Sequence, residues 1–552
     1  MENQRLFLAV ALSVGVIILF QILFPPPKMP PRRDAAPIAG APTETAATSP
    51  ATASGVAGIV PSTAAPAIVP NGESIEVTTS LYRARFNTEG AVETAVELVA
   101  YPETQAADSA PVELVSRHSP SRGLFPVDLI SGNQRVSTAT VPFTVDRGSL
   151  HVESGQEGEL VFRGSYPGWA TLEKRFRFHD GRYDFDIETR VLPDTDKHID
   201  WALMSIDEQG EVHGTSRQDQ LRGRVSWGLE RFHMDSLSVP QMRGEVRKGG
   251  ATPKVFDEAH GKGVVRWAGF DERYFFLGIL PDLSQSASAQ LTALPDAQTV
   301  RLDVVFPLGG AAASGEGALL KARAFTGPKD LDVLRSTEDT LDGVLDYGKF
   351  ATLSRTFVSV LKFFHGITGN WGVAIILLTL AVRGLLFPLN LTSFRSMKKL
   401  QALQPEMTQI REAHKDDPMK MQQEMGKLYQ RNKVNPLGGC LPMLLQFPVF
   451  LGLYYALAQA IELRHAHFAL WITDLSERDP YYVTPVIMGA TMWLQQLWTP
   501  AAGDPTQQMM MRFMPVIFTV SFLKFPSGLV LYWMFSNLVG IAQQWYIRRS
   551  PK

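Results

Sequence analysis

One arginine interrupts a long apolar run in the C-terminal part of the chain. Arg383 is the thirteenth of the twenty residues in segment 371–390, and Pro388 is the other break in that run. An arginine near the centre of a bilayer costs about 2.5–3.5 kcal/mol on insertion scales. We therefore expect Arg383 to face other helices or a water-filled cavity. The alternative is that its side chain extends to the headgroups, because the run ends seven residues later.

The candidate partners of Arg383 are neutral. Thr379 lies one helical turn earlier and would share its face. No Asp or Glu lies centrally in a later apolar run, so we expect hydration rather than a buried ion pair. Proton- and cation-coupled transporters generally use carboxylates within the membrane, so the absence of such carboxylates argues against a transporter. It also leaves the positive charge of Arg383 uncompensated and suited to attracting an acidic polypeptide segment. The polar residues of the other runs are Gln446, Gln459, Gln495, Gln496, Ser536, Asn537, Gln543 and Gln544.

Residues that would support covalent or metal chemistry are scarce. The sequence has no Walker loop, no GxSxG motif and no metal-ligand cluster. Its one cysteine, Cys440, excludes an intrachain disulfide and a cysteine-based zinc cluster. His465 and His467 have a spacing found among metal ligands, but no carboxylate or cysteine pattern accompanies them, which favours a pair of loop histidines. We predict no enzymatic activity, no cofactor and no metal site.

The N-terminal region predicts an anchor and a tether. Segment 6–24, within the proposed anchor 1–24, has only Ser13 and Gln21 as polar residues. Its length matches a hydrocarbon core of about 30 Å. A cleaved signal peptide is the alternative, although its apolar part is usually about 7–15 residues long. Segment 25–71 is rich in Pro, Ala and Thr and cannot bury enough apolar surface to offset its ordering entropy, so we predict a flexible linker.

The next region has the pattern of β-strands. In segment 72–340, Tyr183, Phe185 and Ile187 alternate with charged residues, and the turn at 179–181 precedes them. Short strands separated by turn residues predict a large antiparallel sandwich. Segment 341–370 changes to a helical period with an apolar and a polar face, which predicts an amphipathic helix at the membrane interface. A core helix of the β-domain is the alternative.

Five apolar runs make up most of segment 371–552. Together with the anchor they give six candidate membrane spans. The run 513–525 is short and needs its neighbours 509–511 to cross a bilayer, and the turn at 525–528 allows it to pair with the last run as a hairpin. The five runs are 371–390, 441–460, 481–498, 513–525 and 528–547.

The charge distribution predicts the topology. The chain's formal charge of −2 combines a net −9 in residues 25–370 with a net +7 in residues 371–552. Segment 391–436 carries nine Lys or Arg and five Asp or Glu. Segment 461–480 carries two Arg and four Asp or Glu. The positive-inside rule then places segment 391–436 and both termini in the cytoplasm and the β-domain outside.

Segment 391–436 itself has apolar residues spaced by three or four. Asp417 followed by Pro418 is a helix-start signal, so we predict two helices in an antiparallel coiled-coil hairpin. Its basic surface could meet ribosomal RNA, lipid headgroups or an acidic partner. The alternative is a solvated hairpin whose charges only set the topology. The predicted fold class is thus an α-helical polytopic membrane protein with six transmembrane helices, a large external all-β sandwich domain and a cytoplasmic helical hairpin.

Several motifs follow one another between residues 327 and 547. They are NWG at 370–372, Thr379, VRG at 382–384, VNPLGGC at 434–440, LQFP at 445–448, FALWI at 468–472, DPYY at 479–482, MPVIF at 514–518 and FPSGLVLY at 525–532. In this order they resemble motifs of the YidC membrane protein insertase family. The anchor, linker and β-domain resemble its long Gram-negative form, whose β-domain is similar to a sugar-mutarotase sandwich.

The resemblance implies a membrane protein insertase and folding chaperone of the inner membrane, acting alone or with the Sec translocon. The last five spans would form a groove open to the cytoplasm and to lipid, with Arg383 as its charge. The second aromatic of the last span is Trp533, where relatives often have Tyr, so a hydroxyl is lost there. The other residues that would line the groove or contact substrate are Thr379, Gln446, Phe447, Tyr532 and Trp533.

The resemblance also implies partners. They are nascent membrane proteins, the Sec translocon, membrane lipids and, at the hairpin, ribosome and signal-recognition components; no DNA partner is expected. Five residues follow Ile547, so we expect no long basic ribosome-binding tail. The hairpin residues assigned to recruitment are Arg395, Lys398, Lys399, Arg411 and Lys415.

Two other functions remain open from the sequence. A solute transporter with an external binding domain would use the same spans, although these spans lack the carboxylates that such a transporter is expected to have. A membrane-tethered carbohydrate enzyme would use the β-domain, for which the sequence offers no paired carboxylates.

Overall fold

The computed structural model describes most of the chain after residue 70. The predicted anchor at 6–24 and nearly all of the linker 25–71 lie outside the described residues. The described residues are 71–115, 122–194, 197–209, 224–230, 233–238, 254–256, 264–294, 299–308, 317–432, 434, 441–498 and 505–549.

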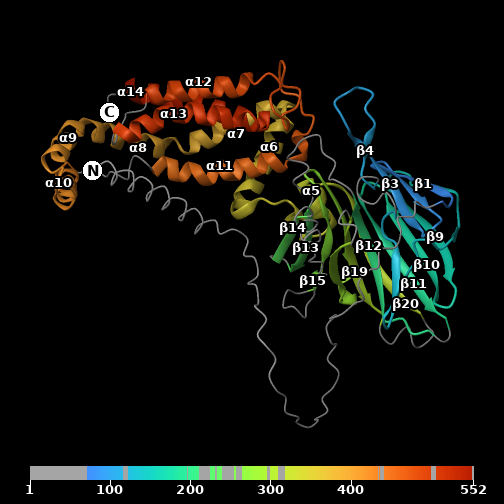
Figure 1. Ribbon diagram of the computed structural model, residues 1–552. Coiled ribbons are helices and arrows are strands. Elements are labelled where there is room, and N and C mark those ends of the chain that lie inside the picture. Colours follow the sequence, from blue (N-terminus) through green and yellow to red (C-terminus); the bar gives the residue numbers. More distant parts are fainter. Residues whose placement is uncertain are drawn as a thin grey trace, which may run out of the picture. The chain divides into compact units, whose positions relative to one another are not determined.

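The β-domain contains three sheets within these residues (Figure 1). All strand pairs are antiparallel except β1 with β8. The first sheet has the order β4 (Pro111–Glu113), β3 (Val92–Pro102), β2 (Tyr82–Asn87), β1 (Ser74–Thr78), β8 (Ser149–His151). The second has the order β14 (His233–Ser238), β13 (Arg224–Glu230), β16 (Trp267–Asp271), β17 (Phe275–Pro281), β20 (Ala318–Pro328), β11 (Asp184–Pro193), β10 (Ala170–His179), β9 (Glu157–Tyr166), β7 (Phe143–Val145). The third has the order β15 (Lys254–Phe256), β18 (Ser288–Ala293), β19 (Thr299–Pro307), β12 (Trp201–Gln209), β5 (Val127–Ser131), β6 (Gln134–Ser137).

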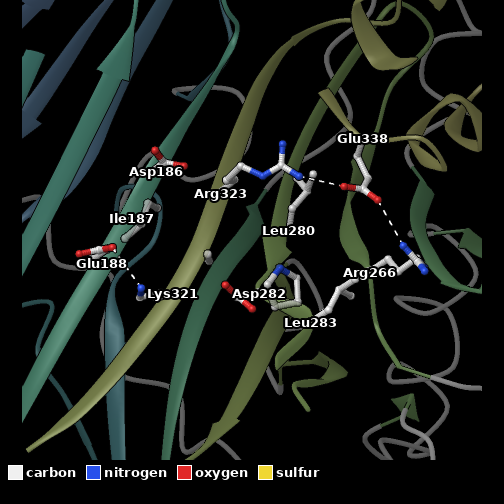
Figure 2. A pocket seen from close by; sticks show the side chains of 12 residues that line it. Asp186, Ile187, Glu188, Arg266, Leu280, Asp282, Leu283, Lys321, Arg323 and Glu338 are labelled. Carbon is white, nitrogen blue, oxygen red and sulfur yellow. Dashed lines mark hydrogen bonds and ion pairs between the residues drawn. The ribbon is translucent and has the colours of Figure 1, made fainter. Parts of the chain in front are cut away.

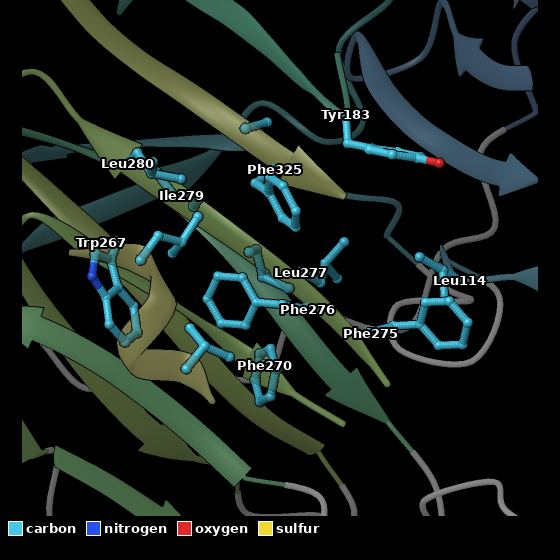
Figure 3. Close-up of a cluster of buried hydrophobic side chains, with 14 of the residues drawn as sticks. Leu114, Tyr183, Trp267, Phe270, Phe275, Phe276, Leu277, Ile279, Leu280 and Phe325 are labelled. Carbon is cyan, nitrogen blue, oxygen red and sulfur yellow. The ribbon is translucent and has the colours of Figure 1, made fainter. Parts of the chain in front are cut away.

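One apolar core joins the inner faces of these sheets, which confirms the predicted β-sandwich. Figure 3 shows part of it, with Phe276 at the centre. The ring of Phe276 meets that of Trp267 edge to face, with 5.7 Å between their centroids. It also lies over Gly278, where a Cβ would come within 2.5 Å of the ring. The core therefore needs glycine at that position to accommodate the aromatic ring.

Strand β10 shows how the two-residue period selects the inward side chains. Leu172, Phe176 and Phe178 are buried, and Lys174 shares their face and is fully buried. Its Nζ donates to the carbonyls of three residues, at 2.6 to 3.3 Å. Burial lowers the pKa of Lys174 to about 7. The predicted turn after β10 is present, with Gly181 in the left-handed region at φ 76°. The acceptors of Lys174 are the carbonyls of Gly90, Ala91 and Phe125.

A buried network of charges crosslinks the third sheet. Its members come from β5, β6, β12, β19 and the residue preceding β5 by five positions, and they alternate in sign. Representative distances are 2.9 Å from Arg122 to Asp128 and 2.7 Å from Arg301 to Asp207. Burial raises the pKa of Asp128, but the surrounding guanidinium groups outweigh it and hold this pKa below its usual range. The six residues are Asp128, Asp207, Asp303, Arg122, Arg135 and Arg301.

Helices make up most of the described chain after residue 330 (Figure 1). They are α5 (Leu331–Thr337), α6 (Ala351–Thr368), α7 (Trp371–Leu385), α8 (Phe387–Ala402), α9 (Gln404–Ala413), α10 (Pro418–Arg431), α11 (Leu441–Gln459), α12 (Val483–Trp498), α13 (Pro505–Phe522) and α14 (Ser527–Arg549). The 3-10 turns are η2 (Leu283–Gln285), η4 (Leu341–Val344), η5 (Gly348–Phe350) and η7 (Ile461–Leu463). Helix α14 packs against α7, α11 and α12, so it is central to the arrangement of the later helices.

In the described residues, no single helix is both long enough and apolar enough to qualify as a membrane span. Helices α7 and α8 qualify when taken together, although they meet at an angle of 58°.

The bend between α7 and α8 corrects the sequence-based expectation of one continuous run at 371–390. The break falls at Leu386, and Pro388 occupies the first turn of α8. Proline lacks the N–H that would continue the ladder, and its ring clashes with the carbonyl four residues earlier, which here is that of Gly384. The helical hairpin has a second break at Leu403, before Pro405, for the same reason. It thus contains α8, α9 and α10 rather than two helices. The predicted cap is confirmed, because Asp417 accepts from the N–H of Lys420 at 3.0 Å.

Helix α6 buries part of its predicted apolar face, including Phe357 and Leu361, and leaves Phe363 and Ile367 exposed. On its polar side, Lys362 forms ion pairs with acids of α5 and of the 461–480 loop. One of these, Glu462, has a raised pKa because it is buried.

The 461–480 loop connects the β-domain to the helices. Arg464 donates to the carbonyl of Pro102 at 2.7 Å, and Arg273 of the β-domain donates to the carbonyl of Ser476 at 2.9 Å. Gln105 donates to the carbonyl of Thr473 at 3.0 Å. These contacts fix both ends of the loop against the β-domain.

The same loop positions the ends of α7 and α14. The N–H of Ser527 at the start of α14 donates to the carbonyl of Glu477 at 2.7 Å. Asn370, the cap of α7, donates to the carbonyl of Phe468 at 3.0 Å. The ring of Phe468 covers Gly372 so closely that a Cβ there would clash with it. The loop therefore sets the relative placement of the two helices that carry the polar cluster described next.

Candidate functional site

Arg383 joins α7 to α14 through a serine. Its Nε and Nη2 both donate to the Oγ of Ser536, at 2.8 and 2.5 Å. The side-chain amide of Gln543 donates to the main-chain carbonyl of Arg383 at 3.2 Å. The expectation that Arg383 faces another helix is thus met by the geometry, and its partner is a neutral hydroxyl rather than an acid.

Arg383 occupies the last turn of α7 rather than the middle of a helix. The peptide dipoles at a helix C-terminus favour a nearby cation by about 0.3–1 kcal/mol. The bend at Leu386 therefore creates a helix end where the sequence indicated a continuous run. This end offsets part of the cost of placing a charge among apolar residues.

Two other predicted residues lie in the same cluster. Gln446 on α11 donates to the hydroxyl of Tyr532 on α14, with 3.0 Å between Nε2 and Oη. Tyr532 is almost fully buried, and Ser536 follows it by four residues on the same face of α14. Gln446 and Tyr532 thus form one hydrogen-bonded pair, Arg383 and Ser536 form another, and both pairs meet on α14.

Thr379, Phe447 and Trp533 lie apart from this path. Thr379 is completely buried, and its hydroxyl donates to the carbonyl of Ile375 in its own helix at 2.7 Å. Phe447 is 38% exposed on α11. Trp533 packs edge to face on Phe450, with centroids 4.8 Å apart, and also contacts aromatic rings of α13. Contact of these residues with a substrate stays a prediction.

Ser536 and Gln543 are members of the cluster that the site prediction omitted. They follow Tyr532 by four and eleven residues, which places all three on one face of α14. This spacing was a usable signal once Arg383 was known to need polar partners. Asn537, also polar, faces α12 instead and donates to Met488 and Thr491 at 3.5 and 3.4 Å.

The basic residues assigned to recruitment lie on the helical hairpin. Four of them are exposed, whereas Arg411 on α9 is half-buried. The hairpin holds together through a small apolar cluster that includes Leu403, Met407 and Leu428. The exposed four are Arg395, Lys398, Lys399 and Lys415.

Within the described residues, no three His, Cys, Asp or Glu side chains gather as a metal site would require. His465 approaches Asp474 at 4.0 Å and stands in the left-handed region at φ 58°. Cys440 lies outside the described residues.

The β-domain has a separate cavity of about 440 Å³ on β11, β17 and β20 (Figure 2). Glu338 pairs with Arg323 at 2.9 Å and with Arg266 at 3.4 Å, and Glu188 pairs with Lys321 at 3.7 Å. The other two acids of the lining, Asp186 and Asp282, are hydrogen-bonded to His179 and Ser284. The acids of this cavity are thus engaged in ion pairs and caps.

Comparisons with known proteins cover nearly the whole chain. The family model described as 60Kd inner membrane protein matches residues 363–552, and the YidC periplasmic domain matches residues 74–360. The Membrane protein insertase YidC of Syntrophus aciditrophicus (strain SB) is 36% identical over 99% of this chain and 100% of that protein. The protein of the same name from Nitratidesulfovibrio vulgaris (strain DP4) is 37% identical over 100% of both chains. A solved structure titled "Active YidC insertase crystal structure with the first transmembrane domain resolved" covers 87% of this chain and 94% of that chain, at 19% identity and a TM-score of 0.37.

Proposed function

The chain belongs to the YidC membrane protein insertase family, and from this premise we propose that it inserts nascent membrane proteins into the bacterial inner membrane. The family has a periplasmic β-sandwich domain, and the β-domain of residues 74–328 corresponds to it. The identity with named insertases along the full chain supports this assignment.

The proposed topology has six spans, with both termini in the cytoplasm. It assigns the anchor 1–24, the linker 25–71, the periplasmic domain 72–340, the interfacial helix 341–370 and the insertase core 371–552. The charge asymmetry between the hairpin 391–436 and the 461–480 loop supports it. The exposed Phe363 and Ile367 on α6 are compatible with a helix that lies against lipid.

In the proposed mechanism, a hydrated groove shortens the apolar path that a polar segment must cross. Moving charges and backbone groups through about 30 Å of hydrocarbon is costly because they lose water. Arg383 would attract an acidic segment transiently while the apolar part of the substrate moves into lipid. The observation that carries this proposal is the polar cluster of Gln446, Tyr532, Ser536 and Arg383, because it supplies polar contacts among apolar helices. Phe447 would contact the apolar part of the substrate, and Thr379 and Trp533 would line the groove.

We further propose a folding-chaperone role, with or without the Sec translocon. The exposed basic face of the hairpin would recruit ribosome and signal-recognition components or anionic lipid. No step of this mechanism requires covalent chemistry or a cofactor.

The test is insertion into proteoliposomes that contain the purified chain. A small membrane protein whose translocated end is short should become protease-protected at this end, and protein-free liposomes provide the control. Solute flux through the same proteoliposomes distinguishes a transporter. Insertion no faster than in protein-free liposomes, for every substrate tried, would rule out the proposal.

A further inference from the structure

The bond between Arg383 and Ser536 uses one edge of the guanidinium group. A guanidinium carries five N–H donors in a planar fork, and two of its edges can each meet a pair of acceptors. Ser536 Oγ takes the edge formed by Nε and Nη2. The edge that carries Nη1 is a separate donor pair that points away from this contact.

The Nη1 edge is open in the part of the chain that the structure describes. Among those residues, the hydrogen bonds of the Arg383 side chain are the two to Ser536. Arg383 is partly exposed, whereas Ser536 is only 4% exposed. The buried Ser536 therefore holds the partly exposed guanidinium group of Arg383 in one orientation.

Ser536 is itself well placed to act as a fixed contact. It lies on α14, one turn after Tyr532, and α14 packs directly against α7. The start of α14 is held by the carbonyls of Leu475 and Glu477 in the 461–480 loop. A hydroxyl on such a helix does not have to reorganise when a ligand arrives, so the guanidinium orientation is set in advance.

We propose that Ser536 is a positioning residue, which holds the Nε–Nη2 edge of Arg383 so that the Nη1 edge faces a carboxylate of the incoming segment. This inference rests on the proposed insertase function and specifies its substrate preference. Carboxylates bind guanidinium edges through two parallel N–H···O bonds, so orientation matters as well as charge. Substrates with Asp or Glu in the translocated segment should depend on Ser536, and substrates with Asn or Gln there should not share that dependence.

The test compares two substrates that differ only in charge. A single-span protein carries either two Asp or two Asn in its translocated segment, and the readout is the ratio of their insertion rates in proteoliposomes. Ser536→Ala should lower the Asp-to-Asn ratio about five- to tenfold, the size expected for loss of a charge-assisted hydrogen bond. Ser536→Thr, which keeps the hydroxyl, should restore the ratio to within about twofold of the parent value. Ser521→Ala on α13 is the matched control, because the hydroxyl of Ser521 is bonded within its own helix.

A second background separates positioning from helix packing. Lysine has a point charge without a fork, so in Arg383→Lys the further change Ser536→Ala should alter the ratio by less than about twofold. If Ser536→Ala folds poorly, Ser536→Cys keeps the volume, weakens the acceptor and should lower the ratio in the same way. An unchanged ratio in both Ser536 variants, or an equal effect in the lysine background, would overturn the proposal. If the parent chain inserts neither substrate, the proposed function fails; if it inserts both and the ratio ignores Ser536, only this inference fails.

Discussion

Gln446 on α11 and Tyr532 on α14 are joined by a hydrogen bond of 3.0 Å between Nε2 and Oη. This bond is the connection between α11 and the cluster around Arg383, because Ser536 follows Tyr532 by four residues on the same face of α14. Three helices, α7, α11 and α14, thus contribute side chains to this cluster.

Replacing Tyr532 with Phe should therefore weaken insertion without unfolding the chain. The ring keeps its packing, and loss of a neutral hydrogen bond of roughly 0.5–1.5 kcal/mol corresponds to about a threefold lower insertion rate. Tyr454→Phe on α11 is the matched control, because Tyr454 packs on the rings of Tyr455 and Phe525. Equal rates for Tyr532→Phe and the parent chain would show that the hydroxyl is dispensable.

The charge of Arg383 should matter more than its shape. For substrates with an acidic translocated segment, we expect Arg383→Ala to lower insertion by about tenfold and Arg383→Lys by less, since lysine keeps the charge but not the fork. Protease protection in proteoliposomes measures both variants. Parent-level activity of the Ala variant on every substrate would contradict this expectation.

Thr379 should tolerate loss of its hydroxyl. The hydroxyl is bonded to Ile375 within α7, and the side chain is completely buried. Thr379→Val keeps the shape, so insertion should stay within about twofold of the parent rate. Thr379→Leu should instead lower thermal stability by about 1–3 kcal/mol, because the buried site has no room for added carbons. A Val variant that inserts no acidic substrate would show that the hydroxyl leaves its helix during function.

The buried charges of the β-domain predict its response to acid. The pKa of Asp128 is lower in the folded chain than in the unfolded chain, so its ion pairs contribute stability above the ordinary carboxyl range of about pH 4. This contribution should be lost as the pH falls from there towards the folded pKa. Amide hydrogen exchange on β5, β12 and β19 would measure this loss.

Asp128→Asn tests the same network at neutral pH. Removing one partner leaves Arg122 and Arg135 partly uncompensated, so stability should fall by roughly 3–5 kcal/mol and the acid dependence should shrink. Glu153→Gln, at an exposed position, is the control. Identical exchange in Asp128→Asn and the parent chain would rule out this account.

Arg464 should restrain the end of β3. In Arg464→Ala the carbonyls of Pro102 and Glu103 lose their donor, so proteolysis within residues 101–110 should accelerate by about tenfold. Arg478→Ala, at an exposed position of the same loop, serves as the control. Unchanged cleavage would mean that other contacts suffice to hold this segment.

The β-domain was predictable because its signal is local. The two-residue period of β10 selects the inward residues and even includes Lys174, whose residue type alone would place it at the surface. Three carbonyls that accept from its Nζ come from segments 49 to 84 residues away. Such distant partners are invisible to a local pattern, so the sequence indicates the face but not the reason that a lysine is tolerated there.

The polar cluster was only partly predictable for a related reason. Apolar content identified the segment around Arg383, but the effect of Pro388 on the helix was underestimated, and the bend moved Arg383 to a helix end. Sharing a face with Arg383 suggested a role for Thr379. In the structure the hydroxyl of Thr379 donates instead to a carbonyl of α7, because a threonine in a helix can reach the main-chain carbonyl of the preceding turn.

The contacts between the 461–480 loop and its neighbours share one chemical property. Arg464, Arg273 and Gln105 all donate to main-chain carbonyls, and the N–H groups that begin α14 do the same. Every residue supplies a carbonyl, so the acceptor positions can change identity freely as sequences diverge, whereas the three side-chain donors cannot. The contacts between the 461–480 loop and the β-domain should therefore persist between distant relatives. The residues that supply the carbonyls can vary there without a matching change in the residues that donate to them.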